Sequence, residues 1–232
     1  MQSPDLTVGI VTYIVFVYST VCHEAAHAWS ALKLGDRTAY EGGQVSLDPT
    51  PHVMREPMGM VIVPLASLFL TGGLFGWASA PLSREWTRQN PRESALVALA
   101  GPAANFLLCI AAAICMFLGA KAGVFTLPHS YGRTNIIIGS GGTIWEVAAL
   151  LLSVIFSLNL LLGVFNLIPA PPLDGSNIPL LWLKGRTAQQ YQDLLEQPAM
   201  RLFAFILIYR GVGAIFAPIF FGICDRLHAL FF

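Results

Sequence analysis

The most constraining feature of this chain is a series of long apolar runs. They lie at roughly 6–33, 57–80, 94–120, 144–168 and 202–224. The hydrocarbon core of a bilayer needs about 20 apolar residues in a helix, and each run reaches or approaches that length. Charged residues make up only 11% of the chain, and 13 basic residues balance 13 acidic ones, so no net positive field favours nucleic acid. We therefore expect one membrane-embedded unit over 1–232, with the lipid bilayer around it and no nucleic-acid partner.

The second run differs from the others because Pro64, Gly72, Gly73 and Pro81 divide it into pieces too short to span a membrane. Basic residues in short loops collect on the cytoplasmic side, and a fully spanning second run would divide them evenly between the two sides. If the run re-enters and the N-terminus lies outside, nine basic residues share the cytoplasmic side: Lys33, Arg37, Arg55, Arg84, Arg88, Arg92, Lys184, Arg186 and Arg201. We therefore expect an all-α polytopic membrane protein with four spanning helices and a re-entrant segment at 57–80.

The sequence His23-Glu24-Ala25-Ala26-His27 lies near the end of the first run. In a helix the two imidazoles fall one turn apart on one face, which is the spacing that two zinc ligands need. Glu24 lies between them, where a carboxylate can take a proton from water as a general base. Ionisable groups cost about 2.5–3.5 kcal/mol each at mid-membrane and usually serve function. The pattern therefore predicts His23 and His27 as metal ligands and Glu24 as the catalytic base.

Catalytic zinc takes three protein ligands, so a third must come from elsewhere in the chain. Asp174 is the best candidate, because three prolines between Asn166 and Gly175 must end the fourth apolar helix and leave extended chain. Extended backbone is tolerated within a membrane where it lines a wet cavity. The alternative is a turn residue, since Asp-Gly is a common turn dipeptide. Asp174 can meet the histidines only if helices one and four end on the same side, which agrees with the re-entrant arrangement.

Three motifs resemble those of the site-2 protease family of intramembrane zinc metalloproteases, particularly its short members without a PDZ domain. They are the motif at 23–27, Gly101-Pro102-Ala103-Ala104-Asn105, and the stretch from Asn166 to Gly175. The resemblance covers roughly residues 10–180. It implies that His23, His27 and Asp174 hold one zinc ion and that Glu24 activates water to cut a membrane-spanning substrate. The subgroup usually reads Gly-Trp-Ala-Lys-Pro in its linking region, whereas here Ser79 and Ala80 precede Pro81.

Two asparagines and one polar segment are further candidates. Asn105 and Asn166 could donate hydrogen bonds to a developing oxyanion or to a substrate backbone, although asparagine also joins membrane helices. Residues 41–48 could form a short β-strand on the cytoplasmic rim and hold an unwound substrate by β-addition, the alternative being a solvated loop. Glu146 near an interface and Arg210, which can snorkel, are better interpreted as structural.

These observations predict a zinc-dependent intramembrane endopeptidase that acts on a transmembrane or membrane-tethered protein. Its catalytic core would occupy about 6–180, followed by a C-terminal helix at about 202–224. We expect a multi-pass protein of the cell membrane with its active site toward the cytoplasm. The alternatives are a non-catalytic metal-binding scaffold or transporter, which the intact Glu24 disfavours, and a zinc protease with another third ligand. That ligand would be Glu85, Glu93 or Glu146.

Overall fold

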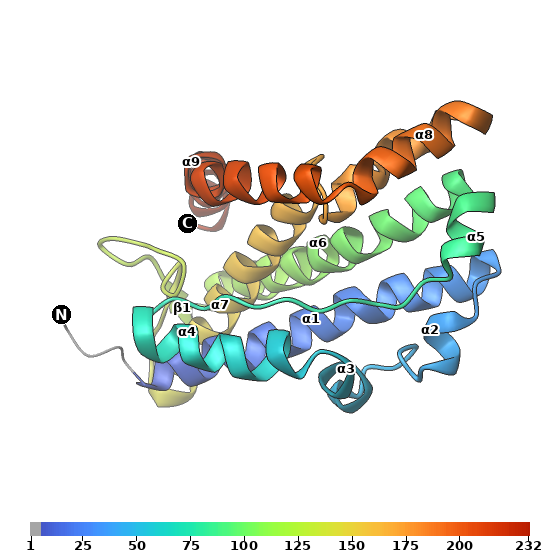
Figure 1. Ribbon diagram of the computed structural model, residues 1–232. Coiled ribbons are helices and arrows are strands. Elements are labelled where there is room, and N and C mark those ends of the chain that lie inside the picture. Colours follow the sequence, from blue (N-terminus) through green and yellow to red (C-terminus); the bar gives the residue numbers. More distant parts are fainter. Residues whose placement is uncertain (1–5) are drawn as a thin grey trace.

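The computed structural model describes residues 6–232, except for the side chains of 201–212. Helices form almost all of this part of the chain (Figure 1). In chain order they are α1 (Leu6–Leu34), α2 (Thr38–Glu41), α3 (Pro49–Arg55), η1 (Met58–Ile62), α4 (Val63–Thr71), α5 (Arg84–Gln89), α6 (Pro91–Lys121), α7 (Thr143–Asn166), η2 (Asp174–Leu181), α8 (Gly185–Glu196) and α9 (Pro198–Phe231). Here η1 is a short π-helix and η2 is a 3-10 helix. Two short antiparallel strands, β1 (Phe125–Thr126) and β2 (Ile138–Gly139), pair between α6 and α7.

Four helices of the described part are long and apolar enough to cross a membrane: α1, α6, α7 and the Gly213–Phe231 part of α9. Helix α6 packs against both α1 and α7. Buried side chains of α6, α7 and α9 form one apolar cluster that includes Met116, Phe156 and Phe220. Other large apolar side chains remain exposed along the helices, as contact with lipid requires. The prediction of an all-α polytopic membrane protein is therefore confirmed.

The run at 57–80 folds as a hairpin with one helical arm and one extended arm. After α4, residues 72–83 return as extended chain alongside η1 and α4 (Figure 1). The Trp77 amide donates to the Gly59 carbonyl at 3.0 Å and joins the two arms. A methyl group at Gly59 would lie 2.2 Å from the Trp77 carbonyl, so this approach requires glycine. The chain therefore enters and leaves at the same end, as the re-entrant prediction requires.

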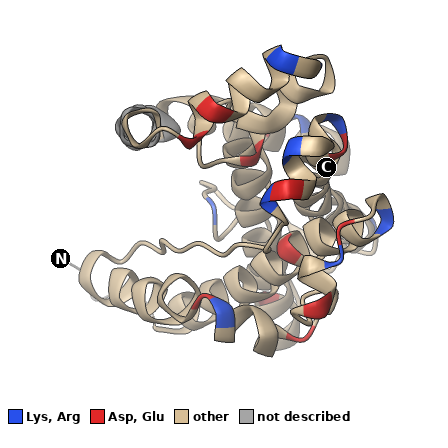
Figure 2. Ribbon diagram, turned by 45° about the vertical axis from the view of Figure 1, so that its right-hand side comes forward, with Lys and Arg blue, Asp and Glu red and all other residues tan. Residues whose placement is uncertain are grey.

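Charged residues gather toward one end of the helical bundle (Figure 2). At that end α5 and α8 are joined by ion pairs that we call the α5–α8 clasp. Arg84 pairs with Glu196, and Arg88 pairs with Asp193 at 2.6 Å and with Glu196 at 3.4 Å. The predicted cytoplasmic segments that contain α5 and α8 therefore lie together at this end of the bundle. The side chains of Arg201 and Arg210 lie outside the described part.

The short strand expected within 41–48 does not form, and this segment is a turn. The chain reverses at Gly43, which has a φ of +74°, and the Gln44 amide bonds back to α2 at 2.9 Å. Asp48 then caps α3 by accepting from the Thr50 amide at 2.8 Å, a bond that lowers the pKa of the Asp48 carboxyl. The turn and the cap use backbone groups that a strand would offer to a substrate. The predicted β-addition at this rim is therefore wrong.

Candidate metal centre

One turn of α1 supplies three of the predicted site residues. The helix runs without a break from Leu6 to Leu34, because this apolar stretch contains no proline. His23 and His27 fall one turn apart toward α6, with Glu24 beside them. All three side chains are buried, with 5–7% of each residue exposed. Buried ionisable groups of this kind need polar partners, and the elements packed against α1 provide them for both histidines.

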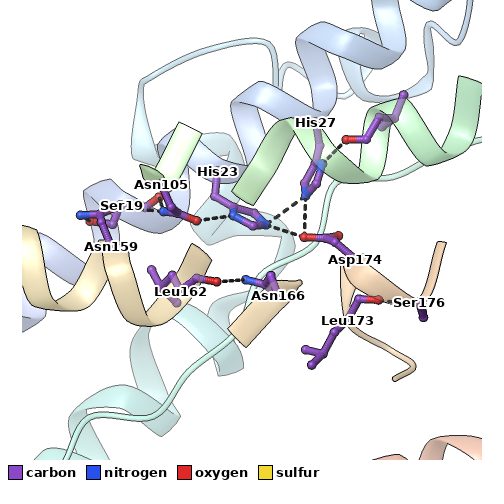
Figure 3. Close-up of polar contacts among 11 residues, drawn as sticks. Ser19, His23, His27, Asn105, Asn159, Leu162, Asn166, Leu173, Asp174 and Ser176 are labelled. Atoms are coloured by element: carbon purple, nitrogen blue, oxygen red, sulfur yellow. Dashed lines mark hydrogen bonds and ion pairs between the residues drawn. The ribbon is translucent and has the colours of Figure 1, made fainter. Parts of the chain in front are cut away.

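The third predicted ligand reaches the same place from the loop after α7. Helix α7 ends at Asn166, and three prolines keep the chain out of a regular helix until Asp174 opens η2. Gly175 permits the close return of this loop, because a methyl group there would lie 2.3 Å from the Leu167 carbonyl. The tight passage over the end of α7 directs Asp174 toward α1 (Figure 3).

The two imidazoles and the carboxylate converge on one point (Figure 3). His23 Nε2 and His27 Nε2 are 2.9 Å apart, and Asp174 Oδ2 lies 3.1 Å from the first and 3.3 Å from the second. Tetrahedral zinc with bonds of 2.0–2.1 Å would place its ligands about 3.3 Å apart, close to these separations. Three ligands also leave the fourth position for water, as catalytic zinc sites do. The donor set therefore fits a zinc ion.

The hydrogen bonds made by the Nδ1 atoms show which nitrogen of each imidazole carries the proton and which directs a lone pair toward the metal centre. The Val97 carbonyl, 2.7 Å from His27 Nδ1, can only accept, so Nδ1 carries the proton. Asn105 Oδ1 lies 2.6 Å from His23 Nδ1 and acts in the same way. Both Nε2 lone pairs then face Asp174 Oδ2, a buried atom that has no hydrogen-bond partner among the residues that the structure describes. Three such electron-rich atoms repel one another unless a cation lies among them.

Helix α6 leaves the centre open at Gly101. A methyl group at Gly101 would lie 2.4 Å from His27 Nε2 and 2.5 Å from His23 Nε2. It would therefore occupy the space beside both nitrogens that face the centre. The sequence indicates for Gly101 only a place in a family motif and in a stretch of small residues that can join membrane helices. Its importance depends on the packing of α6 against α1, which local sequence does not reveal.

A cavity of about 620 Å³ opens onto Glu24 and the three convergent side chains. Its walls come from α1, α6, the end of α7, the extended arm of the hairpin, the loop before η2 and the start of η2, and the facing sides of α5 and α8. Arg88 and Glu196 of the α5–α8 clasp line its charged side. This volume is typical of ligand sites and can hold water together with an extended peptide segment. The arrangement can thus bring water, a carboxylate and a peptide carbonyl together.

The two asparagines predicted as donors occupy different positions. Asn105 is fully buried, and its amide nitrogen donates to Asn159 Oδ1 at 2.9 Å while its oxygen faces His23. It orients the ring and directs no amide hydrogen into the cavity, unlike the oxyanion donor that was expected. Asn166 lines the cavity and donates to the Leu162 carbonyl at 3.0 Å. Its second amide hydrogen remains for a substrate.

The carboxylates of the described residues other than Asp174 lie outside this centre. In the part of the chain that the structure describes, the group of side chains able to share a metal ion is the pair of histidines with Asp174. The alternatives for the third ligand, Glu85, Glu93 and Glu146, lie outside this group. Asp174 is therefore the carboxylate that the geometry favours.

Comparisons with known proteins show the family. The chain belongs to Peptidase family M50, whose model matches residues 11–209. It is 35% identical over 171 residues to YwhC of Bacillus subtilis, described as a candidate zinc metalloprotease, in an alignment covering 71% of this chain and 65% of YwhC. Rip2 of Mycobacterium tuberculosis, described in the same way, is 30% identical over 161 residues, which cover 69% of this chain and 52% of Rip2. The chain thus spans between half and two thirds of the length of these relatives, and no solved structure matches it.

Proposed function

We propose that this protein is a zinc-dependent intramembrane endopeptidase that hydrolyses a peptide bond within or near a transmembrane segment of another membrane protein. The observation that carries the proposal is the convergence of His23, His27 and Asp174 beside Glu24 in one cavity. Membership of Peptidase family M50 supports the reaction class. The substrate would be a transmembrane or membrane-tethered protein, because apolar helices long enough to span a bilayer form the cavity walls.

The proposed chemistry divides between the metal centre and Glu24. Zinc bound by the two histidines and Asp174 would supply a Lewis acid for the scissile carbonyl and make water more acidic. The Glu24 carboxylate removes a proton from water as the water oxygen attacks the peptide carbon. It then gives that proton to the amide nitrogen as the C–N bond breaks. The free amide hydrogen of Asn166 can stabilise the oxygen that gains negative charge.

A substrate has to be extended at the scissile bond, since a helix keeps its carbonyls in hydrogen bonds. The extended arm of the hairpin offers an edge for such a segment. Successive residues of an extended chain direct their backbone groups to opposite sides. Because the Trp77 amide bonds to Gly59 in η1, the backbone groups of Ala78 point away from η1. Those of Gly76 and Ala80, two residues to either side, point the same way as those of Ala78. Since all three residues line the cavity, we infer that an unwound substrate pairs with them by β-addition.

Replacing Ala78 with proline tests this pairing, because proline removes the backbone donor at residue 78 without touching a metal ligand. We expect cleavage of a membrane-embedded substrate to slow about tenfold, as the loss of one backbone hydrogen bond implies. Initial rates in proteoliposomes would measure the effect, alongside zinc content. The matched control is Ala78→Val, which adds bulk but keeps the amide. Equal slowing in both variants would show that bulk, and not the missing donor, is responsible.

We propose that the active site faces the cytoplasmic side of the cell membrane. Basic residues lie in or next to α2, α5 and α8, as they do in cytoplasmic loops: Arg37, Arg84, Arg88, Arg92, Lys184 and Arg186. His27 and Asp174 lie toward the end of the bundle that α5 and α8 occupy, since His27 is in the last third of α1 and Asp174 follows α7. A reporter that is active only in the cytoplasm, inserted next to Lys184, would give a signal. Absence of a signal would mean that Lys184 and the active site lie on the opposite side of the membrane.

A metal-binding scaffold or transporter is the second candidate function, since the three convergent ligands alone would also serve it. Glu24 beside them favours catalysis. The test is to purify the full chain, measure bound zinc, and follow cleavage of a single-spanning peptide whose helix is interrupted by Gly-Pro. We expect one zinc ion per chain and cleavage that a chelator stops. Bound zinc without cleavage would favour the scaffold, and absence of zinc would contradict both functions.

A further inference from the structure

A chain of buried amides leads from α7 to the metal centre (Figure 3). It begins at Asn159, whose Nδ2 donates to the Ile155 carbonyl at 2.8 Å. Asn159 Oδ1 accepts from Asn105 Nδ2 at 2.9 Å, and Asn105 Oδ1 lies 2.6 Å from His23 Nδ1. Both asparagines have 0% of their surface exposed. Polar groups at this depth in a membrane protein are costly and usually serve function.

Each link in this chain determines the orientation of the next. The Ile155 carbonyl can only accept, so Asn159 must turn its amide nitrogen toward it and its oxygen toward Asn105. That oxygen also only accepts, so Asn105 turns its nitrogen toward Asn159 and its oxygen toward His23. The Ser19 carbonyl, 3.4 Å from Asn105 Nδ2, reinforces this orientation. The sequence of donors and acceptors therefore ends in an acceptor at His23 Nδ1.

We propose that Asn159 and Ser19 are positioning residues of the metal centre, which act through Asn105 to keep the proton of His23 on Nδ1 and leave Nε2 free to bind zinc. Ser19 contributes its side chain as well, since Ser19 Oγ accepts from Asn159 Nδ2 at 2.9 Å. The inference rests on the proposed zinc site. It adds to that site a residue of α7, a helix that contributes none of the three ligands.

The opposite orientation of Asn105 shows why this order matters. If the Asn105 amide turned over, its hydrogens would face His23 Nδ1, which would have to accept. A neutral imidazole would then carry its proton on Nε2, the nitrogen that faces Asp174, and could not bind a metal there. The two hydrogen-bond acceptors around Asn105 Nδ2, on Ser19 and Asn159, prevent that turn.

The two histidines differ in how their rings are held. His27 Nδ1 bonds directly to the Val97 carbonyl, a backbone group whose position α6 fixes. His23 instead depends on the side chains of Asn105 and Asn159. Substitutions in the amide chain should therefore disturb one ligand of the centre and leave the other in place. This predicts weakened zinc binding and not an unfolded protein.

The test is the zinc affinity of the purified full chain, measured by competition with a chromogenic chelator. Asn159→Leu is expected to weaken zinc binding about 10- to 100-fold, the usual effect of removing a partner that orients a metal ligand. Ser157→Ala is the matched control on α7. It removes a buried hydroxyl that donates to the Arg133 carbonyl at 2.6 Å and has no link to His23. Its zinc affinity should equal that of the wild type.

Non-additive losses of zinc affinity in single and double variants distinguish a positioning role of Asn159 from a general loss of packing. If Asn159 acts through Asn105, the double variant Asn159→Leu with Asn105→Ala should lose no more zinc affinity than Asn105→Ala alone. Additive losses would mean independent structural effects and would overturn the proposal. Ser19→Ala is the milder variant if Asn159→Leu fails to fold. It should lose less affinity, because Asn159 keeps its bond to Ile155.

The outcomes also distinguish this inference from the proposed function. Zinc in the wild type with unchanged affinity in Asn159→Leu would overturn the positioning role and leave the protease proposal intact. A wild-type protein that binds no zinc would overturn both. If only Ser19→Ala can be purified, an affinity equal to that of the wild type would overturn the proposal, because Ser19 Oγ accepts from Asn159 Nδ2 in the positioning chain. Thermal unfolding of the metal-free variants completes the comparison, and melting temperatures close to that of the wild type are expected.

Discussion

Glu24→Gln is expected to slow cleavage by about 10²- to 10⁴-fold while the protein keeps one zinc ion per chain. Glutamine has nearly the size of glutamate, but its amide does not accept a proton from water at working pH. General base and acid catalysis contributes about 10²- to 10⁴-fold to rates, so a loss of that size is expected. Because His23, His27 and Asp174 are unchanged, zinc content should stay at the wild-type level. Metal analysis and cleavage of a transmembrane peptide in liposomes measure the two quantities on one preparation.

The matched control for this variant is Glu146→Gln, which removes a carboxylate in the first turn of α7 outside the metal cluster. It should cleave at the wild-type rate. Undiminished cleavage by Glu24→Gln would exclude Glu24 from the chemistry. Loss of zinc from Glu24→Gln would instead assign Glu24 to metal binding.

Gly101→Ala is expected to cost the protein its zinc. The added methyl group would lie 2.4 Å and 2.5 Å from the two histidine Nε2 atoms, whereas real Cβ atoms essentially never come within 3.0 Å of another non-bonded atom. The rings or α6 must therefore move, and overpacking of this kind destabilises proteins by about 1–3 kcal/mol. Loss of one partner that orients a metal ligand weakens metal binding by about 10- to 100-fold. Because Gly101→Ala displaces both imidazole ligands, we expect zinc affinity to fall by at least about 100-fold. Chelator competition and thermal unfolding of the metal-free protein would measure the two effects.

Gly222→Ala is the control for this substitution, because a methyl group at Gly222 in α9 meets no atom within 4 Å. It makes the same chemical change in a helix and should leave zinc affinity and cleavage unaltered. Wild-type zinc affinity in Gly101→Ala would show that α6 does not limit the space at the centre. The conclusion that Gly101 of α6 leaves the space needed by the two histidine rings would then be wrong.

The features that the sequence predicts best depend on local patterns. The length of an apolar run determines whether it can span a bilayer, and four helices of the expected kind are present in the described residues. Spacing alone brings His23 and His27 to one helical face. Predicting that Asp174 lies beside these histidines required two further arguments. The first is the proline-rich chain that ends α7, and the second is the requirement that the C-terminal ends of α1 and α7 lie on the same side. The structure brings these three side chains together.

The features that the sequence does not reveal depend on contacts between helices. A buried asparagine in an apolar helix is a clear signal, but residue type does not show whether Asn105 faces the cavity or His23. The same holds for Asn159, whose partners lie on α1 and α6. The extended edge also lies elsewhere than predicted. Polar alternation suggests 41–48, whereas the glycine and alanines at 76–80, which the sequence marks only as part of a linking region that resembles the family's, line the cavity.

The extended arm of the hairpin has a consequence for the choice of substrate. In the proposed β-addition, an edge that binds through backbone groups at Gly76, Ala78 and Ala80 would make little distinction among side chains, because every peptide carries the same amides and carbonyls. Selection then depends on how readily a segment leaves its helix. A glycine lowers the cost of unwinding by about 1 kcal/mol relative to alanine, and a proline by about 3 kcal/mol. We expect scissile segments to share weak helices and no common sequence motif.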